Sequence, residues 1–291
     1  MQPAGQTHKH ARFFPGSADK EFEENLFLTL LLKNETENML RSFEDAGIPA
    51  IPLKGPLFAE KYFGHIGARW TSDIDLLIRT GDLVRAVDKV KTLGYTTEEK
   101  RIEGHFHWSF SKPLAGSPVP LVVELHWDLL KEGTSELNIG EFWDEAEPLR
   151  DFRFIRELSE YHTFYMICLH GWRHNLNGLK YFTDILQLLH VLGDHIHYAA
   201  LFRDAEAHKT LNRIVRTLSI VYKQFPHLEK VKKLPLRRKR LWWEYEALRY
   251  ADNRSIKSYM DWADYQLFSY DTFKHSAAGL REWLQDAAKS R

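Results

Sequence analysis

Apolar positions recur with a helical period over about residues 19–46, so that one side of this segment is apolar and the other polar. Gly47 follows directly and is typical of a residue that ends a helix. The next apolar run, 48–53, is short and interrupted by prolines, which favours a strand. It leads into Lys54-Gly55-Pro56, where the proline indicates the start of another helix. The predicted order is helix, strand, glycine turn and helix.

Three more strands and one helix are predicted in the first half. Residues 73–78 form a strongly apolar run and predict a buried strand, and 82–93 has helical spacing followed by Gly94. Two further strand-like runs, 105–110 and 121–127, are separated by a loop rich in proline and glycine. Such a connection is most simply that of an antiparallel pair.

Beyond about residue 157 only the helical period remains. The predicted helices lie near 158–172, 179–192, 198–208, 210–224, 238–250 and 276–288. We therefore predict an α+β protein, in which a mixed-sheet domain with an N-terminal helix covers 19–150 and a helical bundle domain covers 151–291.

Composition limits the classes of protein that fit. A hydrophobic content of 44%, with 18 Phe, 12 Tyr and 9 Trp, is sufficient for packed cores. Forty basic and forty acidic residues cancel, so any contact with nucleic acid has to be local. The single cysteine, Cys168, excludes an internal disulfide or a cysteine-rich zinc site. No segment has the character of a signal peptide or a membrane span, and we expect a cytoplasmic protein with no membrane contact.

Asp73 and Asp75 are the strongest candidates for chemistry. Alternate residues of a strand share a face, so the two carboxylates converge while Ile74 and Leu76 point the opposite way. Two ionised carboxylates repel each other unless a cation lies between them, and oxygen ligands suit Mg²⁺. The spacing alone is weak, because it is one of seven acid-x-acid pairs in the chain. This pair opens an apolar strand, where acids are disfavoured unless they have a function.

A third carboxylate is expected from the strand at 121–127. Its apolar residues Leu121, Val123, Leu125 and Trp127 share one face, and Glu124 and His126 share the other. If this strand lies beside 73–78, Glu124 faces the two aspartates and completes a metal site. Asp128 is the alternative third ligand, and His126 is expected to orient the ligands.

Residues upstream of the aspartates are candidates for binding phosphate. Lys54-Gly55 places a cation and an open backbone at a strand-to-helix turn, where free N–H groups add partial positive charge. Arg69, four residues before Asp73, could reach the same phosphates through its two parallel donors.

Three segments, taken in order, resemble the uncharacterised nucleotidyltransferase family of the DNA polymerase β superfamily. They are Leu53-Lys54-Gly55, the segment from Arg69 through Ser72 to Ile78, and Glu124-Leu125-His126-Trp127. The segment from Cys168 to about Leu189 resembles the helical half of that family, so the likeness covers about 53–189.

The resemblance implies a polymerase β-like mixed-sheet catalytic domain with a helical partner. It further implies two Mg²⁺ ions on Asp73, Asp75 and Glu124, and an NTP donor, first of all ATP, bound by Lys54, Gly55, Arg69 and Ser72. The superfamily's turn usually carries a serine after the glycine, and here Lys54 would substitute for it. The implied reaction moves an NMP to a small-molecule or peptide acceptor, as in natural-product or peptide modification, with release of pyrophosphate.

Other interpretations remain open. His105-x-His107 and His170-x₃-His174 have spacings that occur in zinc sites, although neither forms a complete ligand set. The run 230–240 holds seven basic residues and could dock tRNA or an acidic partner, with tRNA or a protein side chain then being the acceptor. A catalytically inactive fold used for interaction is the alternative from another class.

Overall fold

The computed structural model describes the chain except residues 1–14, 98–103, 115–118, 245–254 and 290–291. Its first half is built on a four-stranded mixed sheet in the order β1-β2-β4-β3. The strands are β1 (Ala50–Pro52), β2 (Asp73–Ile78), β3 (His107–Lys112) and β4 (Leu121–His126). β2 and β4 are parallel neighbours, whereas β1 pairs with β2 and β3 pairs with β4 in antiparallel fashion. The predicted antiparallel pair is therefore confirmed, and 121–127 lies beside 73–78, which is the condition on which the expected position of Glu124 depends.

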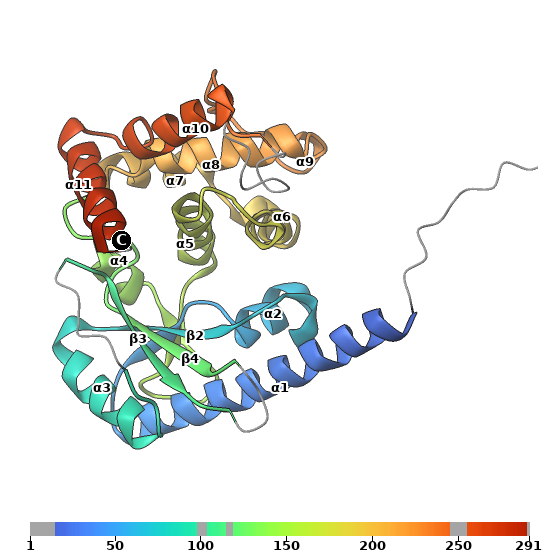
Figure 1. The fold of residues 1–291 in the computed structure, drawn as a ribbon, viewed down its shortest axis with the longest axis vertical. Coiled ribbons are helices and arrows are strands. Elements are labelled where there is room, and N and C mark those ends of the chain that lie inside the picture. The colour runs from blue at the N-terminus through green and yellow to red at the C-terminus, as the bar shows by residue number, and fades with distance from the viewer. Residues whose placement is uncertain (1–14, 98–103, 115–118, 245–254, 290–291) are drawn as a thin grey trace, which may run out of the picture.

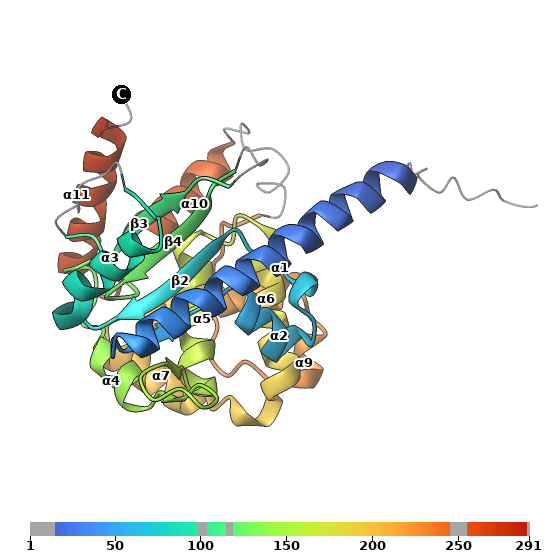
Figure 2. The ribbon, with the colours of Figure 1, turned by 90° about the horizontal axis from the view of Figure 1, so that it is seen from below.

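One face of the sheet is covered by the long helix α1 (Pro15–Asp45) and by α3 (Leu83–Thr92), and α1 crosses this face and extends beyond it (Figures 1 and 2). Ile74, Leu76, Val123 and Leu125 are buried here in one cluster with residues such as Phe43 of α1. Because side chains alternate along a strand, this burial turns Asp73, Asp75 and Glu124 to the opposite face.

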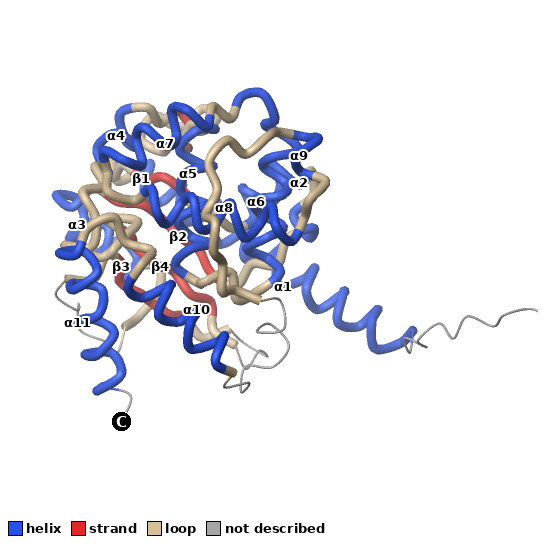
Figure 3. The backbone as a smooth tube through the Cα atoms, turned by 90° about the horizontal axis from the view of Figure 1, so that it is seen from above, coloured by secondary structure: helices blue, strands red, loops and turns tan. Residues whose placement is uncertain are grey.

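The opposite face of the sheet meets the helical half of the chain. α2 (Pro56–Phe63), α5 (Glu160–Arg173) and α6 (Leu179–Leu192) lie on this side. Ile51, Leu53 and Leu77 belong to the same buried cluster as α5 and α6 residues such as Ile167 and Leu188. The sheet and the helices therefore share a continuous hydrophobic core, with the strands lying among helices (Figure 3). The domain boundary near residue 150 stays a prediction.

The remaining elements complete the helical half. These are α4 (Ile139–Asp144), β5 (Glu147–Pro148), β6 (Arg156–Glu157), α7 (Tyr198–Ala207), α8 (Leu211–Gln224), α9 (Leu228–Val231), α10 (Ile256–Leu267) and α11 (Phe273–Lys289), with 3-10 turns at Ile66–Ala68, Thr80–Asp82 and Gly193–His195. The helices predicted near 158–172, 179–192, 198–208, 210–224 and 276–288 are confirmed to within a few residues. In the part of the chain that the structure describes, we find no helix with the length and apolarity that a membrane crossing requires.

One predicted helix is wrong in the part that can be compared. Residues 238–244 of the expected helix at 238–250 are irregular, and the rest lies outside the described residues. Tertiary contacts replace helical ones here, because the Arg238 backbone N–H donates to Ser219 Oγ and the Trp243 indole donates to the Asn175 carbonyl at 2.8 Å. α10 was not predicted from the sequence.

Candidate functional site

Three carboxylates meet on the sheet face that looks toward the helical half. Asp73 and Asp75 come from β2 and Glu124 comes from the parallel neighbour β4, where it lies directly opposite Asp75 in register. Each of the three residues offers a carboxylate oxygen, and these oxygens lie within 4.8 Å of one another. Oxygen atoms this close, from three acids, form a donor set suited to a hard divalent cation such as Mg²⁺. The structure thus brings together the three acids that the sequence singled out.

Asp75 is the buried centre of the cluster, with a relative exposure of 2%. The Lys54 ammonium lies 2.9 Å from its Oδ2, and His126 Nε2 lies 2.9 Å from its Oδ1. Burial opposes ionisation of Asp75, but the charge of Lys54 and the hydrogen bond from His126 outweigh it and hold the pKa of Asp75 well below its usual range. Asp75 is therefore an ionised carboxylate buried at the base of the site.

His126 joins two of the carboxylates. Its Nε2 also lies 3.2 Å from Glu124 Oε2, and since ionised carboxylates only accept, Nε2 carries the proton and donates to both acids. Burial raises the pKa of Glu124, but the hydrogen bond from His126 outweighs it and brings the pKa to about 2. Ser109 Oγ donates to the other oxygen of Glu124 at 3.3 Å. His126 thus orients two carboxylates, as the sequence led us to expect.

His107, Glu124 and His126 form a second group whose ligand atoms lie within 4.8 Å of one another. His107 Nε2 lies 3.8 Å from Glu124 Oε1, and burial together with the neighbouring His126 lowers the pKa of His107 to about 3. Since the Nε2 proton of His126 is committed to Asp75 and Glu124, that nitrogen has no lone pair to offer a metal. The geometry favours the all-carboxylate set over this mixed one.

Asp73 forms the more open edge of the cluster. Burial and repulsion from Asp75 raise its pKa, while the charges of Lys54 and Lys180 act in the opposite direction. Ser72, which is exposed, donates from its Oγ to Asp73 Oδ1 at 3.3 Å. A nearby cation stabilises the ionised form of a carboxyl group that a neighbouring carboxylate destabilises. The electrostatic surroundings of Asp73 therefore suit a metal ligand.

The turn before α2 has the geometry of an anion cradle. Gly55 is the N-cap of α2 with φ 88° and ψ −155°, a region that only glycine adopts without strain. No side chain caps the helix there, and Pro56 follows at its first position. The N–H groups that follow Pro56 in the first turn of α2 therefore have no side-chain cap, which is the arrangement of helix starts that bind anions. Binding of phosphate by Lys54 and Gly55 stays a prediction.

Arg69 has a partner that the sequence did not reveal. Its Nε and one terminal nitrogen donate to the two oxygens of Asp184 at 2.7 and 2.8 Å, and both side chains are almost fully buried. Arg69 also donates to Thr71 Oγ1 at 3.1 Å. This bidentate pair ties the loop before β2 to α6 beside the site. A direct contact of Arg69 with phosphate stays a prediction, and its present contacts are those of a positioning residue.

Asp128 and His170 also have partners within the protein. Asp128 Oδ1 accepts the backbone N–H groups of Leu129 and Leu130 at 2.6 and 3.2 Å, so this alternative ligand holds its own turn. His170 is half-buried, and its Nε2 lies 3.3 Å from the Lys54 ammonium. Within the described residues, no third metal-ligating side chain joins His170 and His174.

The basic run at 230–240 borders a hollow of about 550 Å³ that includes Lys223 and Arg240. Two of its charges are already paired, because Arg237 contacts Glu229 and Arg238 lies 2.8 Å from Asp264. This pairing leaves less charge for a polyanion than the sequence suggests.

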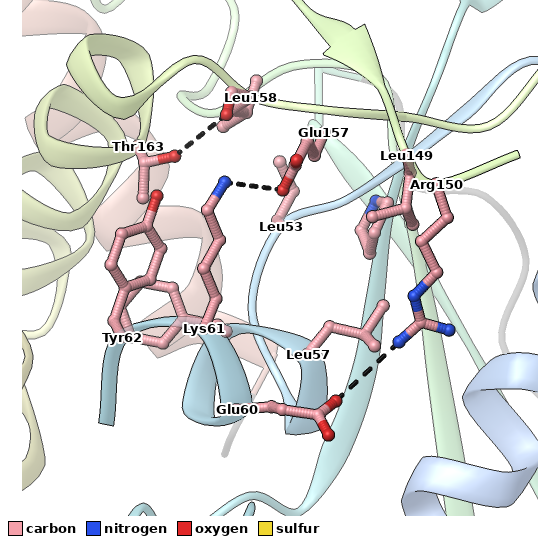
Figure 4. Close-up of a pocket in the computed structure, with 12 residues that line it drawn as sticks. Leu53, Leu57, Glu60, Lys61, Tyr62, Leu149, Arg150, Glu157, Leu158 and Thr163 are labelled. Atoms are coloured by element: carbon pink, nitrogen blue, oxygen red, sulfur yellow. Dashed lines mark hydrogen bonds and ion pairs between the residues drawn. The ribbon is translucent and has the colours of Figure 1, made fainter. Parts of the chain in front are cut away.

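A separate cavity of about 270 Å³ lies between α2 and the β5–β6 hairpin. Figure 4 shows it bordered by ion pairs, Lys61 with Glu157 at 2.7 Å and Arg150 with Glu60 at 3.8 Å. None of the three clustered carboxylates lines this cavity. Its charges are paired with one another, and we do not assign the chemistry to it.

Sequence reasoning missed two cations beside the carboxylates. Lys180, near the start of α6, is close enough to Asp73 to lower its pKa, and Arg173 ends α5 close to His107 and His170. Both lie within or next to the segment 168–189 that carries the family likeness. Their spacing from Asp73 gave no signal, because only the packing of α5 and α6 on the sheet brings them close.

Comparison with known proteins agrees with this geometry. A model of the family described as uncharacterised nucleotidyltransferase matches residues 7–226. No curated protein matches the chain, and no solved structure matches it. The family match spans more than half of the 291 residues and includes all three carboxylates, Lys54 and the α5–α6 pair. The chain belongs to the uncharacterised nucleotidyltransferase family.

Proposed function

We propose that this protein moves an NMP from an NTP to a small-molecule or peptide acceptor in a reaction that depends on Mg²⁺. The observation that carries the proposal is the meeting of Asp73, Asp75 and Glu124 within 4.8 Å on two parallel strands. An intact set of three acids in a member of this family favours a working enzyme over an inactive interaction module.

The reaction is an in-line displacement at the α-phosphorus. A hydroxyl oxygen of the acceptor bonds to the α-phosphorus, the bond to the β-phosphate's bridging oxygen breaks, pyrophosphate leaves and the hydroxyl proton is released to water. Asp73, Asp75 and Glu124 would hold the metal. When bound, Mg²⁺ supplies Lewis-acid stabilisation of the phosphate oxygens and lowers the pKa of the acceptor hydroxyl.

The chain's own residues then bind and orient the donor. Lys54, which contacts Asp75, and the uncapped N–H groups at the start of α2 would neutralise charge on the leaving pyrophosphate. Lys180 lies on the Asp73 flank and would add to this positive charge. Arg69, fixed by Asp184, keeps the loop that leads into β2 in place.

The proposal is tested by ligand binding and by transfer of label. The wild-type protein should be stabilised against heat by one or more of the four NTPs when Mg²⁺ is present, because a ligand that binds the native state raises its stability. It should also move label from an α-³²P NTP. Asp75→Asn should abolish transfer, and Asp73→Asn, at a more open position, should do the same with less risk to folding.

Asp88→Asn is the matched control, since Asp88 is an exposed residue of α3 on the far side of the sheet. It should keep the stabilisation and the transfer of the wild type. Undiminished transfer in a folded Asp73→Asn or Asp75→Asn variant would sink the proposal.

A further inference from the structure

A second cavity, of about 220 Å³, lies beside the carboxylate site and is walled mainly by aromatic rings. Its aromatic residues are Phe106, which precedes β3, Trp172 of α5, Tyr265 of α10, Tyr270 and Trp283 of α11. For scale, a cavity of about 150 Å³ lined by apolar side chains holds one benzene molecule. The space therefore suits a single ring with a short substituent.

The cavity adjoins the Glu124 side of the site. The Phe106 ring lies 5.8 Å from the ring of His126, the residue that binds both Asp75 and Glu124. Arg173 lies 4.9 Å from the Phe106 ring centroid and also lines a small cavity of about 20 Å³ with Lys54 and His126. The cation Lys180 lies near Asp73. A donor whose phosphates are held on the Asp73 side would leave the Glu124 side for the acceptor.

Charge around the cavity favours an anion. Its charged lining residues are Arg173 and Lys131, and no carboxylate belongs to the lining. Within the described residues, no carboxylate pairs with the Arg173 guanidinium. Arg213 lies behind the wall, 4.4 and 4.5 Å from the ring centroids of Trp172 and Tyr270. Its Nε and one terminal nitrogen are buried without a hydrogen-bond partner in the described part of the chain. An anionic ligand complements the Arg173 guanidinium in this lining.

The wall is held in place before any ligand binds. The Trp172 indole donates to Ser269 Oγ at 2.9 Å, and the Tyr265 hydroxyl donates to the Arg173 carbonyl at 2.7 Å. A Cβ atom at Gly279 of α11 would stand 2.2 Å from the Tyr270 hydroxyl, so glycine at this position lets the Tyr270 ring pack against the helix. Fixed walls reduce the entropy lost when a ring enters.

We propose that this cavity binds the acceptor, and that the acceptor carries one aromatic ring and a carboxylate in addition to the hydroxyl that attacks the α-phosphorus. The ring lies among Phe106, Trp172 and Trp283, and the carboxylate pairs with Arg173. This inference rests on the proposed nucleotide transfer, whose acceptor it specifies. A free aromatic acid and the C-terminal aromatic residue of a peptide share this chemistry.

The two sources are separated by titration calorimetry on the full chain with three probes. These are 4-hydroxyphenylacetate for a free acid, N-acetyltyrosine for a peptide C-terminus, and N-acetyltyrosinamide as the neutral counterpart. We expect at least one acid to bind. The affinity for the amide should be lower by about tenfold or more, because the amide lacks one charge-assisted hydrogen bond. Binding of N-acetyltyrosine alone identifies a peptide, and binding of 4-hydroxyphenylacetate alone identifies a free acid. Equal binding of acid and amide, or binding of neither acid, overturns the proposal.

Two pairs of variants locate the binding. Trp283 and Trp262 pack against each other with ring centroids 5.1 Å apart and are similarly exposed, but only Trp283 lines the cavity. Trp283→Ala should therefore weaken binding of the acid severalfold, and Trp262→Ala should not. Arg173→Gln should weaken it about tenfold, whereas Arg203→Gln, at an exposed site on α7, should have no effect. Equal effects within either pair contradict the assignment.

The same variants show whether the nucleoside occupies the cavity instead. If Trp283→Ala weakens binding of Mg²⁺-NTP and leaves the acid unaffected, the acceptor assignment is wrong. The acid titrations need no nucleotide, so they fail or succeed independently of transfer. Loss of acid binding with intact NTP transfer rejects this inference alone, and acid binding without NTP binding rejects the proposed reaction.

Discussion

The ion pair between Arg69 and Asp184 allows structural and phosphate-binding roles of Arg69 to be separated. The two hydrogen bonds are 2.7 and 2.8 Å long, and the side chains are 5% and 1% exposed. Removing one partner leaves the other as a buried unpaired charge. Arg69→Met and Asp184→Leu should therefore each lower the free energy of unfolding by about 3–5 kcal/mol.

The double variant Arg69→Met/Asp184→Leu should behave differently. Replacing a buried ion pair by apolar residues of similar volume is often close to neutral, because the desolvation cost of both charges disappears. We expect it to recover most of the stability lost in either single variant, with a coupling free energy of several kcal/mol. Urea unfolding followed by tryptophan fluorescence at a fixed ionic strength gives all four stabilities.

Nucleotide binding to the double variant then decides the role of Arg69. If Arg69 only positions the loop before β2, the refolded double variant should bind Mg²⁺-NTP within a fewfold of the wild type. A loss of about tenfold or more, as for one charge-assisted hydrogen bond, would place Arg69 on the phosphates. Additive losses of stability in the double variant would refute the buried-pair reasoning itself.

Three further perturbations have defined outcomes. Arg216→Met removes a guanidinium that lies 2.6 Å from Asp261 and 2.8 Å from Asp264, which leaves Asp261 without its cation and Asp264 with Arg238 alone. This variant should lower the free energy of unfolding, measured in urea, by about 3–5 kcal/mol. Arg203→Met, which breaks an exposed ion pair, should lower it by about 1 kcal/mol or less. Gly55→Ala forces a non-glycine residue to φ 88° and ψ −155° and should lower the free energy of unfolding by about 1–3 kcal/mol. Gly81→Ala, with open space around it, should leave the stability nearly unchanged. Burial raises the pKa of the Cys168 thiol, so Ellman's reagent should label native protein only as fast as it unfolds, and rapid labelling would contradict the packing.

The carboxylate site was predictable because its determinants are local. Strand alternation alone turns Asp73 and Asp75 to one face and Glu124 to its own polar face. One assumption, that 121–127 lies beside 73–78, then brings the acids together, and the parallel register of Asp75 with Glu124 confirms it. The likeness to the family pointed to the same residues.

Partners across long sequence separations were not predictable. Asp184 lies 115 residues from Arg69, and His170 lies 116 residues from Lys54. Neither pair leaves a periodic signal, because each depends on how α5 and α6 pack against the sheet. α10 was missed for a related reason: its buried positions include Asp261 and Asp264, whose burial depends on Arg216 of α8 and not on an apolar stripe.

Lys54 takes part both in the carboxylate site and in a contact across a long sequence separation. Its ammonium lies 2.9 Å from Asp75 and 3.3 Å from His170, so one cation joins the carboxylate cluster to the helical half. One positive charge offsets only part of the charge of three clustered carboxylates, and burial together with the remaining repulsion from Asp75 raises the pKa of Asp73. A divalent cation would relieve that repulsion and compete with Lys54 for Asp75. The displaced ammonium would then stand beside the start of α2, where we propose that the phosphates bind. In the proposed reaction, loading of the metal and capture of the phosphates would thus be coupled through a single lysine side chain.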